Sequence, residues 1–234
     1  MALKTGLIGA GVFGGYHAGK IAESEIAEFT GVFDPDPARA KELASKYGVE
    51  AFGTQASLLA EADAVIIACP ATYHAETVRE AIAAGCHVLV EKPLALTGDE
   101  ASSLARAADA AKRVLQVGHQ ERLVLKAMGL FDLPETPVKI EAWRESPPAP
   151  TGRAGDVSVI FDLMIHDLDM VACLMGKAAT VDGEGAIVHS GHIDEAKALL
   201  GFPDGARATV SASRAADERR RSMRLVFENG EIDI

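Results

Sequence analysis

The 234-residue chain carries 23 lysines and arginines against 34 aspartates and glutamates, which gives a formal net charge of −11 at pH 7. This excess of negative charge disfavours nucleic acid and anionic membrane surfaces as partners, because both are themselves negatively charged. With 48% hydrophobic and 24% charged residues the composition is that of a globular protein, and the apolar runs are too short to span a bilayer. We therefore expect neither a nucleic-acid partner nor a membrane partner.

The spacing of cysteines and histidines does not predict a metal site. The three cysteines lack the spacing of metal ligands and cannot all pair, which is typical of reduced thiols in the cytoplasm. His189 and His192 with Asp194 could form a metal cluster, but their spacing fits no standard site and favours an exposed turn. We expect a cytoplasmic protein without a bound metal.

The first half of the chain alternates strand-like and helical segments. Short runs rich in Val, Ile, Leu and Phe, as expected for strands buried on both faces, occupy residues 3–11, 28–34, 62–70, 86–93 and 113–119. Segments of helical composition lie between them, at residues 16–24, 36–48, 75–85 and 97–112. This alternation predicts an α/β domain with a doubly wound parallel sheet over residues 1–119.

The second half, residues 120–234, has a different pattern. A turn-rich segment over 144–156 precedes a helix over 160–175, and strand-like runs follow it. These runs occupy residues 179–188, 196–202, 206–213, 222–230 and 231–234. We expect an α+β domain whose helices pack on one face of a mainly antiparallel sheet. The sheet looks incomplete, and an uncovered edge favours a homo-oligomer, a dimer or tetramer, assembled through this domain.

A glycine-rich turn follows the first predicted strand. Gly9, Gly11 and Gly14 have G-x-G-x-x-G spacing, which suits a tight turn, close approach of a pyrophosphate and close contact between helix and strand. Asp34 follows the next strand, where a carboxylate binds the ribose hydroxyls and repels a 2′-phosphate, so NAD is favoured over NADP. Arg39 could bind a 2′-phosphate instead. The alternative is that these residues only shape turns.

A stripe of charge interrupts the apolar helix in the second half. Within FDLMIHDLDM, Asp162, His166 and Asp169 fall at i, i+4 and i+7 and share one face. The stripe is either the solvent face of the helix or part of a site, and the segment alone favours the solvent face. Lys92, in the EKP that ends the run at 86–93, lies at the carboxyl end of a predicted strand, where ligands of doubly wound sheets bind.

In combination, these motifs resemble the glucose–fructose oxidoreductase, inositol dehydrogenase and MocA family. The glycine-rich turn, CPATYH, EKP and DLMIHDLD occur in the same order as in that family. The resemblance implies a Rossmann domain and a catalytic group of Lys92, Asp162 and His166, with His166 as general base and the stripe facing the nicotinamide rather than bulk water. It implies cofactor contacts at Gly9, Gly11, Val12, Phe13, Gly14, Asp34, Cys69, Pro70, His74, Glu91 and Lys92.

Within the family, VGHQER and DVSVIFDLMIHDLD are most similar to the UDP-N-acetylglucosamine 3-dehydrogenase branch. That branch usually continues the ER with Phe-Asn-Pro, whereas this chain has Leu123, Val124 and Leu125. Substrate contacts are expected from Lys92, Arg122, Asp162 and His166. Further arginines could neutralise a nucleotide-sugar diphosphate, because guanidinium groups match phosphate oxygens; they are Arg144, Arg153 and Arg219 to Arg221.

The sequence thus predicts an NAD-dependent oxidoreductase that oxidises a hydroxyl of a sugar or nucleotide sugar, with UDP-N-acetylglucosamine at C3 as the candidate substrate. Two alternatives stay open. One is a protein that binds or senses the dinucleotide without turnover, against which the retained Lys92, Asp162 and His166 argue. The other is a family reductase that acts on an imine or a non-sugar carbonyl.

Overall fold

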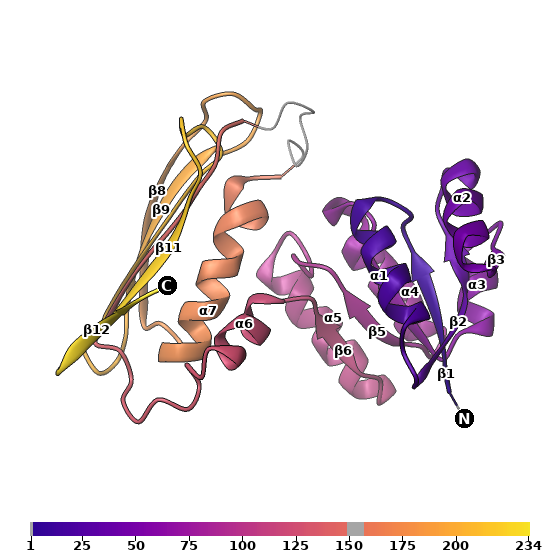
Figure 1. Cartoon of the computed structure of the whole chain (residues 1–234), viewed down its shortest axis with the longest axis horizontal. Helices are drawn as coiled ribbons and strands as arrows, with labels where there is room; N and C mark the ends of the chain where they lie inside the picture. Colours follow the sequence, from indigo (N-terminus) through magenta and orange to yellow (C-terminus); the bar gives the residue numbers. More distant parts are fainter. Residues whose placement is uncertain (1, 149–156) are drawn as a thin grey trace. The chain divides into compact units, whose positions relative to one another are not determined.

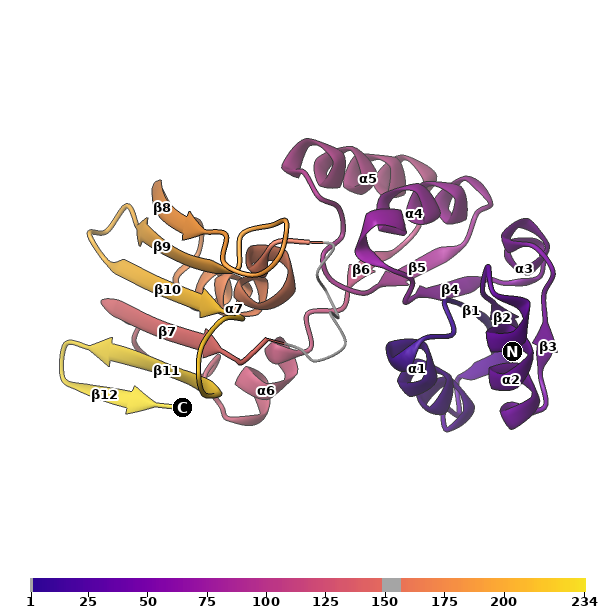
Figure 2. The ribbon, with the colours of Figure 1, turned by 90° about the horizontal axis from the view of Figure 1, so that it is seen from above.

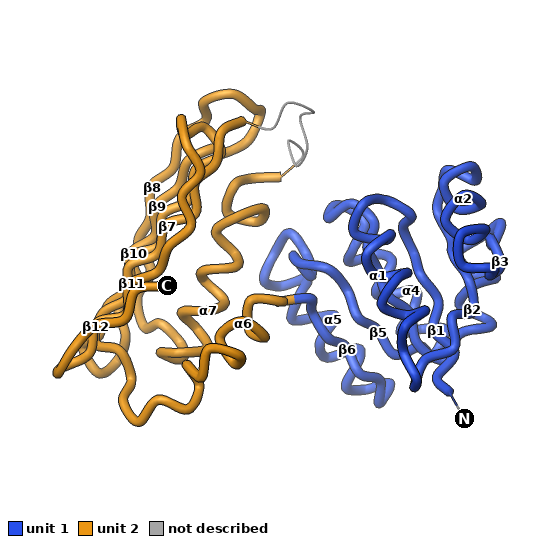
Figure 3. The backbone as a smooth tube through the Cα atoms, viewed as in Figure 1, with its two compact units in different colours: residues 1–118 blue, residues 119–234 orange. Residues whose placement is uncertain are grey.

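The chain forms two compact units in the computed structural model, which describes residues 2–148 and 157–234. The first unit comprises residues 1–118 and the second residues 119–234 (Figure 3). This division falls one residue from the boundary at 119 that the change of sequence pattern predicts. Each unit has its own hydrophobic core and is described separately.

The first unit is built on a parallel sheet of six strands in the order β3-β2-β1-β4-β5-β6. Its strands are β1 (Leu3–Ile8), β2 (Ala27–Phe33), β3 (Glu50–Ala51), β4 (Ala64–Ile67), β5 (His87–Val90) and β6 (Leu115–Val117). The expected doubly wound parallel sheet is therefore confirmed, with the short β3 added at one edge. The strand order reverses direction between β1 and β4, and this is where ligands of such sheets bind.

Helices cover both faces of this sheet. Helices α1 (Val12–Ala22) and α2 (Pro37–Tyr47) lie on one face, and α4 (His74–Ala83) and α5 (Gly98–Ala111) lie on the other (Figure 2). Helix α3 (Gln55–Glu61) packs on the same side as α4 and α5, where its Leu58 and Leu59 join their apolar core. Adjacent residues of β1 serve the two cores, which explains why the strands read as continuous apolar runs.

Local chemistry fixes several helix ends. The Asp36 carboxylate caps α2 by accepting hydrogen bonds from the amides of Ala38 and Arg39, at 2.9 and 3.4 Å. The same helix ends at Gly48, whose φ of 67° lies in the left-handed region that favours glycine. Helix α3 was not predicted from sequence, although Thr54 caps it in the same way. Its seven residues are too few for a clear helical period.

The second unit pairs a mixed sheet with helices on one face only. Its strands are ordered β12-β11-β7-β10-β9-β8, and only β7 and β10 run parallel. They are β7 (Lys139–Glu145), β8 (Thr180–Ala186), β9 (Glu195–Gly201), β10 (Arg207–Ser213), β11 (Arg220–Phe227) and β12 (Gly230–Asp233). Helices α6 (Glu121–Ala127) and α7 (Ile165–Met175) lie together on one side of it (Figure 1). The expected mainly antiparallel α+β domain is confirmed, but β7 and α6 were not anticipated.

Alternation along the strands decides which face of this sheet is buried. In β7, the side chains of Ile140, Ala142 and Arg144 are buried on the side of α7. Trp143 points to the other side, where the Arg220 guanidinium carbon lies 4.1 Å from the centroid of the Trp143 ring. Among the described residues no helix covers that second face (Figure 1). No helix in the described ranges is long and apolar enough to cross a membrane.

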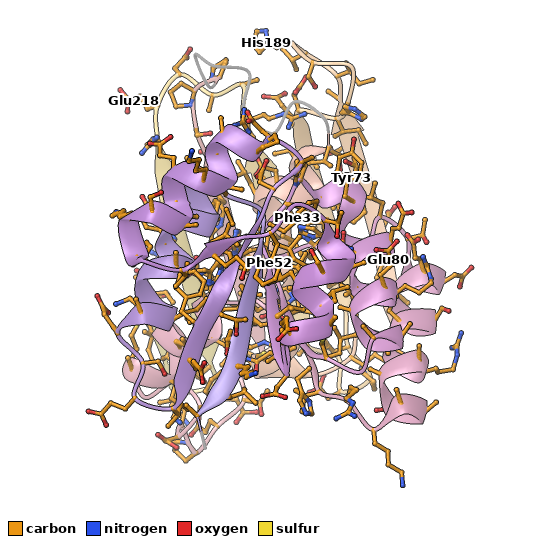
Figure 4. The ribbon with its side chains drawn as sticks, turned by 90° about the vertical axis from the view of Figure 1, so that its right-hand side faces the viewer. Phe33, Phe52, Tyr73, Glu80, His189 and Glu218 are labelled. Atoms are coloured by element: carbon orange, nitrogen blue, oxygen red, sulfur yellow. The ribbon has the colours of Figure 1, made fainter. Side chains whose placement is uncertain are left out.

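A single carboxylate organises the connection between β8 and β9. Asp194, 1% exposed, accepts hydrogen bonds from the amides of Val188, His189 and Ser190, and from the Arg214 guanidinium at 2.7 Å. Burial alone would raise its pKa, but these donors outweigh burial and hold the pKa of Asp194 far below its ordinary value. The Asp194 carboxylate therefore holds the loop that carries His189 (Figure 4). Separately, the described residues contain no cluster that could hold a metal.

Candidate functional site

The glycine-rich turn joins β1 to α1, and its three motif glycines differ in what surrounds them. A Cβ on Gly9 would lie 2.7 Å from the backbone of Ala68 and Cys69, and the φ of Gly9 is +100°. A Cβ on Gly14 would lie 2.0 Å from the Gly9 carbonyl oxygen, so that α1 can pack against the turn only without a side chain here. A Cβ on Gly11 would meet no atom of this chain within 4 Å. Two glycines are thus required by packing, and the third leaves its backbone open to a ligand.

The first turn of α1 provides donors for an anion. Gly11 is its N-cap and has no side chain to occupy the first amides of the helix. The amides at a helix N-terminus and the positive end of the helix dipole make such a terminus a binding site for phosphate. Val12 and Phe13, in this first turn, are 64% and 37% exposed. The residues fit the pyrophosphate of a dinucleotide.

A cavity of about 460 Å³ adjoins the turn at the carboxyl ends of β1, β2 and β4. Of the predicted cofactor residues, Gly9, Asp34, Cys69 and Pro70 line it, together with Arg39. Phe33, Tyr73 and Glu80, which are labelled in Figure 4, also line it. Its volume is typical of small-molecule pockets, and it offers both a carboxylate and apolar walls.

The Asp34 carboxylate is hydrogen-bonded to the backbone of the glycine-rich turn. It is 8% exposed and accepts hydrogen bonds from the amides of Ala10 at 2.7 Å and Asp36 at 2.9 Å. Each oxygen has a second lone pair, so the carboxylate can still accept from ribose hydroxyls. Burial raises the pKa of the neighbouring Cys69 thiol, which keeps it neutral in this wall.

The EKP segment after β5 is fixed from two sides by histidines. His17 of α1 donates from Nε2 to the Glu91 carboxylate at 2.6 Å. The ring of His74 is 1% exposed, and its nitrogens lie 2.6 Å from the Pro93 carbonyl oxygen and 2.9 Å from that of Cys69. Carbonyl oxygens only accept, so the ring bonds both at once only when both nitrogens carry a proton.

Two expected cofactor residues therefore have other partners. His74 was expected to line the cofactor site, but its ring is buried between two backbone carbonyls and supports the loops that line it. The Glu91 side chain, likewise expected to contact the cofactor, is held by His17. His17 was not identified from sequence, because a lone histidine on a short helix carries no pattern. Lys92, between Glu91 and Pro93, is half-buried.

The charged stripe of the second unit is not a plain solvent face. Residues Ile160–Met164, which contain Asp162, form a π-helical turn that runs directly into α7, a feature often found at functional sites. Asp162 is half-buried, and the His166 and Asp169 side chains are only 20% and 9% exposed. Asp169 forms a two-point ion pair with Arg122, at 2.8 Å from Nε. Asp169 thus has a structural partner, and Arg122, expected at the substrate, already holds a carboxylate.

Behind His166 lies a buried network of charges. Arg144 donates two hydrogen bonds of 2.8 Å to Asp167, which is 2% exposed, and reaches Glu121 at 3.5 Å. Glu121 also accepts from Arg221 and lies 4.0 Å from the Nδ1 atom of His166. Arg144 and Arg221 face each other across β7 and β11, and Glu121 offsets the repulsion between them. Glu121 and Asp167 were both missed, since buried pairs leave no trace in local pattern.

The arginines considered for a diphosphate are mostly committed elsewhere. Arg144, proposed as a phosphate ligand, is instead buried in ion pairs with Asp167 and Glu121. The run Arg219 to Arg221 does not act as a unit, because successive strand residues point to opposite faces. Arg220 stacks on Trp143 on the open face, and Arg221 binds Glu121 on the helical face. Arg153 lies outside the described residues.

The parallel sheet, the strand reversal, the glycine-rich turn and the adjoining cavity together define a dinucleotide-binding protein with a Rossmann domain and an α+β second domain. Comparison with known proteins agrees with this class. The chain belongs to the GFO/IDH/MocA oxidoreductase family: the profile of the NAD-binding Rossmann fold matches residues 3–119, and that of the family's C-terminal domain matches residues 125–233. It is an NAD(P)-dependent oxidoreductase.

Several relatives resemble the chain over most of its length. UDP-N-acetylglucosamine 3-dehydrogenase of Acidithiobacillus ferrooxidans is 36% identical over 97% of this chain and 72% of the relative. A solved structure of that enzyme superposes with a TM-score of 0.92 over 100% of this chain and 77% of its own. The rhizopine catabolism protein MocA of Rhizobium meliloti is 31% identical over 90% of this chain and 71% of its own.

Alanine substitutions at the glycines should separate folding from binding. Gly14→Ala should destabilise the protein by ~3 kcal/mol or prevent folding, because the added methyl meets the Gly9 carbonyl. Gly11→Ala should keep the melting temperature but weaken NAD binding about 10-fold or more, since the methyl occupies the space that the pyrophosphate requires. Thermal melts and calorimetric titration with NAD check both results.

Gly15→Ala is the matched control, because a Cβ at Gly15 also meets nothing within 4 Å and the residue lies inside α1. This variant should be as stable as the parent or more stable, since alanine favours a helix over glycine. Equal NAD affinity for Gly11→Ala and Gly15→Ala would contradict a pyrophosphate site at Gly11.

Proposed function

We propose that this protein is an NAD-dependent dehydrogenase that oxidises a secondary hydroxyl of a sugar or nucleotide sugar, with C3 of UDP-N-acetylglucosamine as the first substrate to test. The observation that carries the proposal is the 36% identity, over 97% of the chain, to an enzyme named for that reaction. Another relative, an inositol 2-dehydrogenase of Rhizobium meliloti at 29% identity, is named for a substrate of the same chemical class, a polyhydroxylated ring.

The chemistry assigns a role to each predicted catalytic residue. A bound NAD supplies the acceptor for the hydride that leaves the ring carbon. His166 accepts the proton of the hydroxyl on that carbon, for which an imidazole suits neutral pH. Lys92 donates a hydrogen bond to the same oxygen and stabilises its developing negative charge. Asp162 binds neighbouring hydroxyls and orients His166.

Binding of a nucleotide-sugar diphosphate would require a cationic side chain beside the groups that act at the ring. Among the described residues Arg122 is a candidate for this contact, because its side chain is 52% exposed although it pairs with Asp169. We propose that it contacts the substrate while Asp169 holds it in place. Leu123 and Val124, where the branch usually has Phe and Asn, are 70% and 46% exposed and give this surface an apolar character.

A panel of UDP-sugars, inositols and free sugars, assayed by the absorbance of NADH, tests the proposal against its alternatives. Turnover of UDP-N-acetylglucosamine supports it in full, and turnover of another sugar or inositol corrects the substrate. NAD binding without any turnover would favour a dinucleotide-sensing protein. Reduction of imines or non-sugar carbonyls in the reverse assay, with no activity on sugars, would identify the third class.

The cofactor preference should follow from Asp34. Its carboxylate lines the cavity, where it would pair with the ribose diol and repel a 2′-phosphate. The dissociation constant for NAD should therefore be lower than that for NADP by a factor of about 10 or more. Asp34→Ser should narrow or reverse this preference, because Arg39 lines the same cavity and can then pair with the phosphate. Calorimetric titration with both dinucleotides measures it, and equal affinities in the parent protein would contradict the proposal.

The role of His166 can be tested by one conservative change. His166→Asn should leave the melting temperature and NAD affinity unchanged, but lower kcat by ~10²–10⁴, the usual contribution of a positioned acid or base. Lys92→Met should be at least as damaging, since it removes the donor and leaves an apolar stem. His189→Asn, on the β8–β9 loop, is the control. A kcat for His166→Asn close to that of the parent would contradict the assignment of His166 as the general base.

We also propose that a second copy of the chain covers the open face of the second-unit sheet. This face has apolar area from Trp143, on which Arg220 stacks, and from Leu199, which is 47% exposed. Two hollows of about 360 and 770 Å³ also lie along its strands. Sedimentation should show a dimer or tetramer at micromolar concentration. Trp143→Glu should shift it toward monomer, and a parent that sediments only as monomer would exclude the proposal.

A further inference from the structure

The contact between His17 and Glu91 has no part in the chemistry proposed above, yet it joins two segments that do. The two atoms, Nε2 and Oε1, are 2.6 Å apart across 74 residues of sequence. The side chains are only 15% and 10% exposed. His17 lies in the middle of α1, whose first turn follows the glycine-rich turn, and Glu91 directly precedes Lys92.

The surroundings of Glu91 leave its carboxylate little freedom. Its backbone amide donates to the Ile67 carbonyl at 2.9 Å, which aligns the end of β5 with β4. A Cβ on Gly118, at the end of β6, would lie only 3.3 Å from the Oε2 atom of Glu91. The carboxylate is thus packed between the ends of the strands and α1. A carboxylate in such a place requires a polar partner, because burial without one is costly.

The position of Lys92 depends on the same segment. The Glu91 side chain is fixed by His17, and the Pro93 carbonyl lies 2.6 Å from a ring nitrogen of the fully buried His74. The residues on either side of Lys92 are therefore held by two histidines from two different helices, α1 and α4. Without the first contact, only one side of the segment would remain fixed by a histidine.

We infer that His17 is a positioning residue for Lys92: by holding the Glu91 carboxylate, it fixes the segment that carries the lysine and ties it to the helix that begins at the pyrophosphate site. This inference rests on the proposed function, in which Lys92 touches the reacting oxygen. His17 itself touches neither substrate nor reacting atoms. Displacements of about 1 Å at a catalytic group cost up to ~100-fold in rate, so the contact matters without taking part in the reaction.

His17→Leu is the test variant, because it keeps much of the volume and removes the hydrogen bond. We expect kcat to fall ~30-fold with the best substrate of the panel, while KM and the NAD dissociation constant change by less than about threefold. His17→Gln, which retains an amide donor, should recover part of kcat. Glu23→Gln is the control, since it breaks an exposed ion pair with Lys20 beside the same helix and should change nothing.

Hydrogen exchange provides a measure that needs no substrate. In His17→Leu the amides of residues 91, 92 and 94–96 should exchange about 10-fold faster, whereas those of β1 and β4 should not change. His17→Leu combined with Glu91→Leu should lose no more kcat than either change alone, because the two residues act as a unit.

The outcomes separate the inference from the proposed function. If the parent turns over nothing in the panel but exchange in 91–96 still rises in His17→Leu, the substrate is wrong and the positioning contact stands. If kcat and exchange in His17→Leu both match the parent in a folded protein, the inference is overturned. A loss of kcat that is fully matched by a loss of NAD affinity or of melting temperature would also overturn it.

Discussion

The first unit depends on the contact between Gly14 and the Gly9 carbonyl, because it sets how closely α1 approaches the end of β1. With no side chain at Gly14, the helix begins directly at the turn, and a helix N-terminus in such a place is suited to bind phosphate. The same approach sets the course of α1 and thereby brings His17 to Glu91. One steric requirement near the start of the chain thus governs both the glycine-rich turn and the support of the EKP segment.

The second unit differs in that charged side chains are buried between its sheet and its helices. Arg144 and Asp167 are both buried and meet through two parallel hydrogen bonds, and Glu121 bridges Arg144 to Arg221. Buried pairs seldom add stability over apolar residues, but a shift that separates the partners is costly, because it leaves a buried charge unpaired. We interpret the network as the frame that fixes α6 and α7, and with them the π-helical turn and His166.

Much of this could be read from the sequence, and the failures have physical causes. The glycine spacing and Asp34 were found because they belong to short local motifs, and the strands of the first unit because burial on both faces makes their apolar runs continuous. Strand β7 was missed since its inward residues include Arg144, which breaks the apolar alternation. His17 and Glu121 were missed because each acts through a partner far away in sequence, at Glu91 and at Arg221, which only the fold brings near.

The depth of the Arg144–Asp167 pair also determines how this protein responds to its solvent. Mobile ions screen charges over roughly 8–10 Å of water at physiological ionic strength, but they cannot enter a pair whose side chains are 10% and 3% exposed. The Arg224–Asp233 pair at the sheet edge, 44% and 60% exposed, is open to them. Salt therefore weakens the exposed pair between β11 and β12 more than it weakens the Arg144–Asp167 pair, so the hold of Arg144 on α7 depends little on the salinity of the medium.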